Sequence, residues 1–207
     1  MGTVDRMCVN FILFDNFETL DVFGPVEILS RIENADLHYI SMEGKAMKSR
    51  QNYYIQTEPI FSVIPDGILV IPGGQGTRNL VDNEAFISKL KSICNSAEYV
   101  LSVCTGSALL AKTGVLNNQT ATSNKKAFEW VKSINRSVNW IEQARWTVDG
   151  KYYTSSGVSA GMDMSLGFIS DLFGEEKAVQ IARDIEYVWN RNKEYDFFNV
   201  TIDSITV

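Results

Sequence analysis

Residues Tyr99–Lys112 read YVLSVCTGSALLAK, and the periodicity of this stretch changes halfway along it. The apolar residues Val100, Leu101 and Val103 are typical of a parallel strand that is buried on both faces. From Thr105 onward, small and apolar residues recur in a helical pattern. The two halves meet at Cys104, and Gly106 beyond it permits the close backbone approach that a sharp turn needs. A strand that turns into a helix at such a residue has the geometry of a nucleophile elbow.

Cys104 therefore has two interpretations. N–H groups at the start of a helix, together with the positive end of the helix dipole, lower the pKa of a thiol placed there. The alternative is a buried structural cysteine, which is the commoner role of an intracellular cysteine. The stretch taken alone favours the nucleophile slightly, so we take Cys104 as a candidate catalytic residue.

Length and composition are those of one globular domain. The 207 residues are 45% hydrophobic and 21% charged, which is ordinary for a globular protein, and we expect a single domain over residues 1–207. The net charge is −6 and the chain contains no basic run. Nucleic acid and anionic membranes are therefore poor candidates for partners.

We expect a protein of the reducing cytosol. The N-terminal sequence MGTVDRMCVNFILF lacks the regions of a signal peptide, and no run of 18 apolar residues occurs. The three cysteines, Cys8, Cys94 and Cys104, are widely spaced and suggest neither a disulfide framework nor a metal cluster. We interpret Cys8 and Cys94 as structural.

Strand and helix patterns alternate along the chain. We predict strands over Met7–Phe14, Leu37–Met42, Tyr53–Thr57 and Ile68–Ile71, and helices over Leu20–Ile32, Glu84–Ser96, Lys125–Ile134, Ser159–Leu172 and Glu175–Asn190. We expect Pro25 in the first turn of its helix and a hairpin turn at Asp149-Gly150, and the tail from Arg191 has no assignment. This order predicts a doubly wound α/β fold with a mostly parallel central sheet flanked by helices.

Ligands bind beyond the carboxyl ends of the strands in such folds, and the three loops after Phe14, Ile71 and Val103 carry unusual residues. Asp21 follows the first of these strands. Beside the Cys104 sulfur it would share one proton with the thiol, because two acids in contact cannot both ionise cheaply. Either a protonated Asp21 donates to a thiolate, or the thiol keeps its proton and Asp21 is the base. The other interpretation is a carboxylate that merely favours a helix start.

Gly73 and Gly74 lie in the glycine-rich loop that follows the strand Ile68–Ile71. We predict that their N–H groups, with the Thr105 amide, face a developing negative charge, although a plain turn is the alternative. The spacing does not fit a phosphate-binding loop. His38 is the single histidine, and we interpret it as a solvated or half-buried residue of a strand rather than as a partner of Cys104.

Four segments resemble the ThiJ/PfpI superfamily, which has the class I glutamine amidotransferase-like (flavodoxin-like) fold: FDNFETLDVFGPVEIL, ILVIPGGQG, LSVCTGSALLAKTGVLNNQTATS and SSGVSAGMDMSLGFI. They span residues 14–169 in the family's order. Within the superfamily, the pattern is most similar to isonitrile hydratases. That resemblance implies a small-molecule substrate, R–N≡C, to which water is added to give an N-substituted formamide. It also implies Asp21, Cys104 and Thr105 as functional residues, no metal or organic cofactor, and a homodimer.

The chain departs from the family at the segment after the elbow helix. Relatives often read A-T-x-H there, whereas this chain has Ala121-Thr122-Ser123-Asn124. Asn124 cannot act as a base, which disfavours a peptidase mechanism. In the glyoxalase and deglycase branch the acid is a glutamate at the position of Asp21, so the shorter aspartate modestly favours a hydratase.

Two classes of function follow. The first is a cytosolic isonitrile hydratase-like enzyme that uses Cys104 and Asp21, with glyoxalase or deglycase activity as its variant. The second is a redox- or metabolite-sensing protein whose Cys104 is oxidised or capped without turnover. Formamide production from an alkyl isocyanide would separate them.

Overall fold

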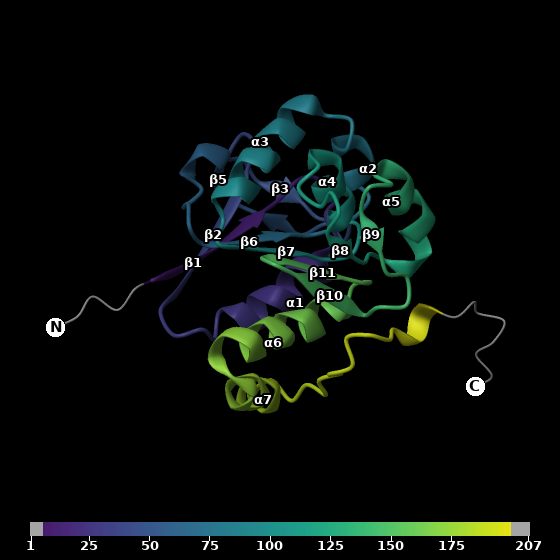
Figure 1. Ribbon diagram of the computed structural model, residues 1–207. Helices are drawn as coiled ribbons and strands as arrows, with labels where there is room; N and C mark the ends of the chain where they lie inside the picture. The colour runs from purple at the N-terminus through teal and green to yellow at the C-terminus, as the bar shows by residue number, and fades with distance from the viewer. Residues whose placement is uncertain (1–5, 200–207) are drawn as a thin grey trace.

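A seven-stranded sheet forms the centre of the structure, a computed structural model that describes residues 6–199 (Figure 1). Its strands are β1 (Met7–Ile12), β2 (Ala35–Ser41), β5 (Glu58–Pro59), β6 (Ile68–Ile71), β7 (Tyr99–Ser102), β10 (Trp146–Asp149) and β11 (Tyr152–Ser155). They lie in the order β10-β11-β7-β6-β1-β2-β5. All neighbours are parallel except the antiparallel pair β10 and β11. The expected mostly parallel sheet is confirmed.

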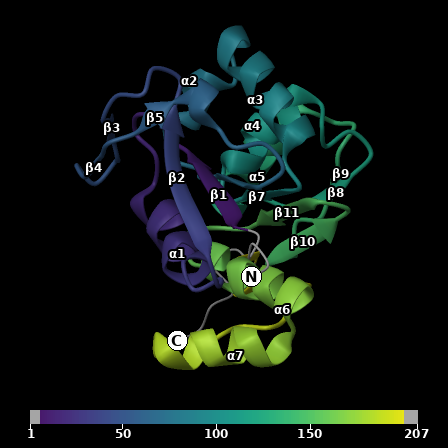
Figure 2. The ribbon, with the colours of Figure 1, turned by 90° about the vertical axis from the view of Figure 1, so that its left-hand side faces the viewer.

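Helices cover both faces of this sheet (Figures 1 and 2). One face carries α1 (Thr19–Leu29) and α6 (Ala160–Phe173), with α7 (Glu175–Asp184) packed on α6. The other carries α2 (Thr77–Leu80), α3 (Glu84–Ser96), α4 (Gly106–Thr113) and α5 (Phe128–Ile134). Two small sheets, β3 (Met47–Lys48) with β4 (Tyr54–Ile55) and β8 (Thr120–Ala121) with β9 (Asn139–Trp140), lie outside the main one.

The central strands are buried because they have helices on both sides. Every residue of β6, which reads ILVI, is buried, and so are the last three residues of β7. Ile71 at the end of β6 pairs with Ser102 at the end of β7. From β1 the chain goes outward to β2 and then returns to β6 on the other side of β1. Such a reversal of strand order opens a crevice at the carboxyl ends of the strands, and the loops after β1, β6 and β7 border it.

Pro25 is not in the first turn of its helix, as we had expected. The helix α1 begins at Thr19, so that Pro25 lies in its interior. A proline there cannot supply the N–H that the carbonyl of Asp21 would otherwise accept. The local spacing of apolar residues did not reveal this interior position.

The helix α7 ends at Asp184 rather than at the predicted Asn190. Glu186 has a φ of +52°, and it closes the helix by donating its N–H to the carbonyl of Arg183 at 3.1 Å. The N–H of Tyr187 donates to the carbonyl of Ala182 at 2.8 Å. These two bonds form a Schellman motif, which normally has glycine at this position. The unusual glutamate explains why the sequence pattern missed the helix end.

Three shorter predictions also need correction. The hairpin turn is one residue later than expected, since Asp149 belongs to β10 and Gly150, with a φ of +57°, begins the turn. The predicted strand Tyr53–Thr57 shortens to β4, which pairs with β3 outside the main sheet. The predicted helix Lys125–Ile134 begins with a 3-10 turn over Lys125–Ala127. These are boundary errors that leave the architecture unchanged.

Candidate active site

Cys104 lies at the turn between β7 and α4 with a φ of +57°, in the left-handed region. This conformation costs a residue other than glycine about 1–2 kcal/mol, and residues held in it cluster at functional sites. The turn is tight because Gly106 packs on the backbone of β6, where a Cβ would overlap the carbonyl oxygen of Ile71. The elbow that the sequence predicted at Cys104 is confirmed, and its left-handed φ shows that it is strained.

Hydrogen bonds fix both peptide groups of Cys104. Its N–H donates to the carbonyl of Ser156 at 2.9 Å. Its carbonyl accepts from the hydroxyls of Ser107 at 3.1 Å and Ser123 at 2.9 Å. These three serines are all buried and come from three separate segments. The strained conformation is therefore held by tertiary structure rather than by the turn alone.

Asp21 lies in the first turn of α1 and its side chain is fully buried. Its Oδ2 accepts a hydrogen bond from the N–H of Gly73 at 2.8 Å. Asp21 and Thr105, the residue after Cys104, both lie against Gly73, and the Cys104 side chain lowers the pKa of Asp21. The other oxygen, Oδ1, is buried and has no well-aligned hydrogen-bond partner among residues 6–199. The loops after β1, β6 and β7 thus converge as expected, and one buried carboxylate oxygen of Asp21 has no hydrogen-bond partner among residues 6–199.

Burial decides the protonation of this pair. It raises the pKa of Asp21 to about 7, with a further rise from Glu18, against the lowering effect of the Gly73 N–H and of Cys104. Burial also raises the pKa of the Cys104 thiol well above its ordinary value, and the charge of Asp21 adds to the rise. The main chain and hydroxyl of Thr105 lower it, but by less.

The direction of the Cys104 shift corrects our expectation of a lowered pKa at the helix start. Loss of solvation and the neighbouring carboxylate together outweigh the N–H groups of the elbow, because a buried anion loses its water while its acidic neighbour repels it. Of the two arrangements that the sequence left open, the structure favours the one in which the thiol keeps the proton. Asp21 is then the base of the pair.

Gly73, Gly74 and Thr105 are in the site, but the two glycine amides are already engaged. The Gly73 N–H donates to Asp21, and the Gly74 N–H donates to Oγ1 of Thr105 at 3.0 Å. Thr77 adds a hydroxyl donor to the same Oγ1 at 3.1 Å. Neither glycine amide is therefore free to face a substrate, contrary to the expected oxyanion role. They orient Asp21 and Thr105 instead.

Glu18 belongs to the site and was missed by the sequence analysis. Its charge raises the pKa of both Asp21 and Cys104. It is held by its own N–H, which donates to the carbonyl of Gly73 at 2.9 Å, and by a hydrogen bond from the side chain of Gln51. Gln51 comes from the connection between β3 and β4, more than 30 residues further along the chain, so local sequence contained no signal for this contact.

Neither His38 nor Asn124 supplies a base. His38 lies half-buried on β2, which two strands separate from β7, and its near charges are Asp36 at 3.6 Å and Glu58 at 3.8 Å. The interpretation of His38 as a strand residue is confirmed. Asn124 uses its side-chain oxygen to accept from the N–H of Ala127 at 3.1 Å. Among residues 6–199, the site therefore has a cysteine beside a carboxylic acid, and no histidine lies in it.

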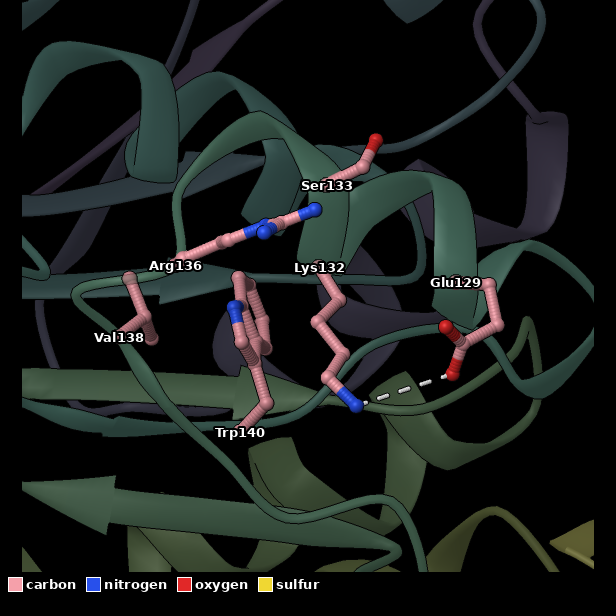
Figure 3. A pocket seen from close by; sticks show the side chains of 6 residues that line it. All are labelled: Glu129, Lys132, Ser133, Arg136, Val138 and Trp140. Carbon is pink, nitrogen blue, oxygen red and sulfur yellow. Dashed lines mark ion pairs between the residues drawn. The ribbon is translucent and has the colours of Figure 1, made fainter.

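Other features of residues 6–199 add nothing to this site. They contain no group of three or more His, Cys, Asp or Glu side chains that could hold a metal ion, and none of their helices is both long and apolar enough to cross a membrane. An open hollow beside α5, shown in Figure 3, is lined by Glu129, Lys132, Ser133, Arg136, Val138 and Trp140. A 3.9 Å ion pair joins Glu129 to Lys132 at its edge. No residue of the elbow lines it.

Known proteins of three kinds have sequences similar to this one. An isonitrile hydratase of Pseudomonas putida is 26% identical over 180 residues, which cover 86% of this chain and 78% of that protein. A deglycase of Pyrococcus horikoshii is 27% identical over 72% of this chain and 89% of its own length. The transcriptional regulator GbdR of Pseudomonas aeruginosa is 24% identical over 90% of this chain, but only 52% of the regulator is matched.

Solved structures show the same fold. A THiJ/PfpI family protein from Pseudomonas syringae has a TM-score of 0.82 at 22% identity, over 88% of this chain and 76% of that one. Drosophila melanogaster DJ-1beta has a TM-score of 0.76 at 20% identity, over 89% of this chain and all of its own. Residues 7–171 match the DJ-1/PfpI family itself. With the elbow and the doubly wound sheet in place, the chain belongs to the DJ-1/PfpI family.

Proposed function

We propose that this protein is an isonitrile hydratase-like enzyme, a carbon–nitrogen lyase of one domain that adds water to an isocyanide and releases an N-substituted formamide. The observation that carries the proposal is the burial of Asp21 and Cys104 as neighbouring acids, with Oδ1 of Asp21 lacking a hydrogen-bond partner among residues 6–199. The similarity to the Pseudomonas putida isonitrile hydratase supports it.

The first step joins the sulfur of Cys104 to the isocyanide carbon. The thiol proton passes to Asp21 as the S–C bond forms, so that a free thiolate need not accumulate. The carbon atom takes up that proton from Asp21, which is a carboxylate again at the end of the step. The product is a thioimidate, Cys104–S–CH=N–R. A buried acid with a pKa of about 7 is suited to this exchange, because a proton-transfer group works best when its pKa is near the working pH.

The second step adds water to the thioimidate. Asp21 removes a proton from the water as its oxygen bonds to the carbon, and the nitrogen takes that proton, giving Cys104–S–CH(OH)–NH–R. The hydroxyl proton then passes through Asp21 to the sulfur as the C–S bond breaks. R–NH–CHO leaves and the thiol is restored, so that one water is consumed in total. Thr105, which lowers the pKa of the sulfur, stabilises the departing thiolate.

Two other functions are less well supported. A redox sensor reacts through the thiolate, and the raised pKa of Cys104 keeps that form scarce at neutral pH. A deglycase is the stronger alternative, because deglycases are among the similar proteins and the site has a cysteine beside a carboxylic acid. Incubation with methylglyoxal in place of the isocyanide tests it.

The decisive experiment measures formamide production from cyclohexyl isocyanide by chromatography. We expect turnover in the wild-type protein and its loss in Cys104→Ala. Cys8→Ala is the matched control, since Cys8 is a half-buried thiol on β1, and it should keep full activity. Absence of formamide with the wild type, or retained turnover in Cys104→Ala, would reject the proposed function.

The assembly and location are also proposals. We propose a homodimer in a reducing cytosol that binds no nucleic acid, on the basis of the resemblance to isonitrile hydratases, the net charge of −6 and the three free cysteines. Light scattering coupled to gel filtration tests the dimer. A mass of one chain across the micromolar range would contradict it.

A further inference from the structure

The chain after α7 forms a segment that we call the C-terminal strap, residues 185–199. Figure 1 shows it in yellow-green, leaving α7 and running below the edge of the sheet. The carbonyl of Lys193 accepts from the N–H groups of Arg145 at 2.8 Å and Trp146 at 3.2 Å. The N–H of Asp196 donates to the carbonyl of Gln143 at 2.7 Å. The strap therefore lies against the segment that enters β10.

Arg145 joins the strap to α6 through its side chain. Its Nε and Nη2 both lie 2.6 Å from Oδ2 of Asp163 on α6. Its Nη1 lies 3.4 Å from Oδ1 of Asp196 on the strap. Arg145 is 6% exposed, Asp196 is 1% exposed and Asp163 is fully buried. A buried guanidinium between two carboxylates fixes direction as well as distance, because its donors form a rigid planar fork.

Asp163 receives further donors on its other oxygen. Oδ1 accepts from the hydroxyl of Tyr187 at 3.1 Å and from the N–H of Asn190 at 2.9 Å. Both donors belong to the strap, and the indole N–H of Trp189 donates to the carbonyl of Asp163 at 3.2 Å. The carboxylate is therefore satisfied on both oxygens, and removal of the strap would leave Arg145 and Asp163 without half of their partners.

The main chain of Arg145 leads directly to the elbow. Its carbonyl accepts the N–H of Ser156 at 2.8 Å, and the carbonyl of Ser156 accepts the N–H of Cys104 at 2.9 Å. The two peptide groups of Ser156 therefore connect Arg145, in the buried ion cluster, to Cys104. The proposed reaction does not use Arg145, Asp163 or the strap, so their burial needs another explanation.

We propose that Arg145 is a positioning residue for Cys104: Asp163 and the strap fix Arg145, and through Ser156 it holds Cys104 in its left-handed conformation with the sulfur beside Asp21. The inference rests on the proposed role of Cys104 as the reactive group, but it does not depend on which substrate that group attacks. When the hold on Ser156 is loosened, Cys104 relaxes to an ordinary conformation, and its sulfur leaves the carboxyl.

A double-mutant cycle on the chemistry of Cys104 tests the proposal. The rate of alkylation by iodoacetamide is measured against pH for the wild type, Asp21→Asn, Arg145→Lys and the double variant, with the Cys104 peptide quantified by mass spectrometry. In the wild-type background, Asp21→Asn removes a charge that disfavours the thiolate, so the rate at pH 7.5 should rise at least about tenfold. In the Arg145→Lys background the same change should alter the rate by less than about twofold, because the two groups no longer meet.

Two further variants keep the test decisive. Asp196→Asn removes the charge that the strap places against Arg145, so it should also reduce the effect of Asp21→Asn on the alkylation rate. This variant takes the place of Arg145→Lys in the test if Arg145→Lys does not fold. Val188→Ala is the control on the strap, since Val188 is 90% exposed, and it should leave the full effect of Asp21→Asn. Thermal unfolding accompanies each measurement.

The outcome separates positioning from simple stabilisation. If Arg145→Lys, or Asp196→Asn in its place, unfolds at a lower temperature but keeps the full tenfold effect of Asp21→Asn, the cluster only stabilises the fold and the inference is overturned. Formamide production is measured on the same samples, and a loss in kcat with an unchanged KM is expected. If the wild type makes no formamide, the proposed function fails while the alkylation cycle still decides this inference.

Discussion

Replacing Asp21 with asparagine should separate the charge of this side chain from its shape. Asparagine has the same size, and its side-chain oxygen can still accept the hydrogen bond that the Gly73 N–H gives to Asp21 at 2.8 Å. The substitution removes the negative charge that raises the pKa of Cys104, and it removes the carboxyl group that carries the proton in the proposed reaction.

The size of the effect follows from the burial of both groups. Two unit charges about 4 Å apart repel by about 4 kcal/mol at an effective dielectric constant of 20, which corresponds to about three pKa units. Because Asp21 is fully buried and Cys104 is 7% exposed, solvent screens little of this. We therefore expect the pKa of the Cys104 thiol to fall in Asp21→Asn and its alkylation rate at pH 7.5 to rise at least about tenfold. Turnover should nevertheless fall by about 10²–10⁴-fold, which is the usual contribution of general acid–base catalysis.

The assay follows alkylation of Cys104 and formamide production on the same samples across pH. The expected result is a nucleophile that is more readily alkylated and an enzyme that is less active. Glu27→Gln is the matched control, since Glu27 is an exposed residue of the same helix that pairs with Arg31 at 2.6 Å. An unchanged alkylation profile would show that Asp21 does not act on the sulfur. Full turnover in Asp21→Asn would remove Asp21 from the mechanism.

Three further predictions test the physical account of the fold. The pKa of Asp21 rises to about 7 on folding, so the folded chain binds more protons than the unfolded chain between about pH 4 and 7. The free energy of unfolding should therefore fall by about 4 kcal/mol as the pH rises across that window. Urea titrations should show no such fall in Asp21→Asn. Gly106→Ala places a methyl group against the carbonyl of Ile71 and should lower the free energy of unfolding by about 3 kcal/mol. Gly150→Ala, which has open space around it, should leave the alkylation profile of Cys104 unchanged. Glu186→Gly relieves a left-handed residue at the end of α7 and should stabilise the protein by about 1 kcal/mol, a rise in Tm of about 3 °C by calorimetry; an unchanged or lower Tm would contradict that account.

The elbow could be predicted from sequence because its determinants are local. An apolar run that turns into a helix at Cys104, with Gly106 two residues later, specifies both the strand and the tight turn. The convergence of the three loops followed from the alternation of strands and helices, because the carboxyl ends of parallel strands meet at one edge of the sheet. Asp21 was therefore placed beside Cys104 from its position after the first strand alone.

The electrostatics of the site could not be predicted in this way. The elbow pattern indicated a lowered pKa for Cys104, since the N–H groups of a helix start are visible in the sequence. The loss of water around the sulfur and the charges of Asp21 and Glu18 are not visible there, and they prevail. The glycine amides were likewise misassigned, because the carboxylate and the hydroxyl that engage them come from α1 and from the elbow.

The sequence by itself determined the order of strands and helices, the family pattern and the position of the elbow cysteine, because these depend on residues that are neighbours along the chain. Only the tertiary structure decided which of the two acids in the site keeps its proton and that the glycine amides are already engaged. It also decided that the strap reaches the elbow through Arg145 and Ser156. Burial and hydrogen bonding join segments such as 143–146, 156–163 and 185–199, and no local pattern records which of these segments will meet. The chemistry of Cys104 is therefore encoded in contacts that exist only after the chain has folded.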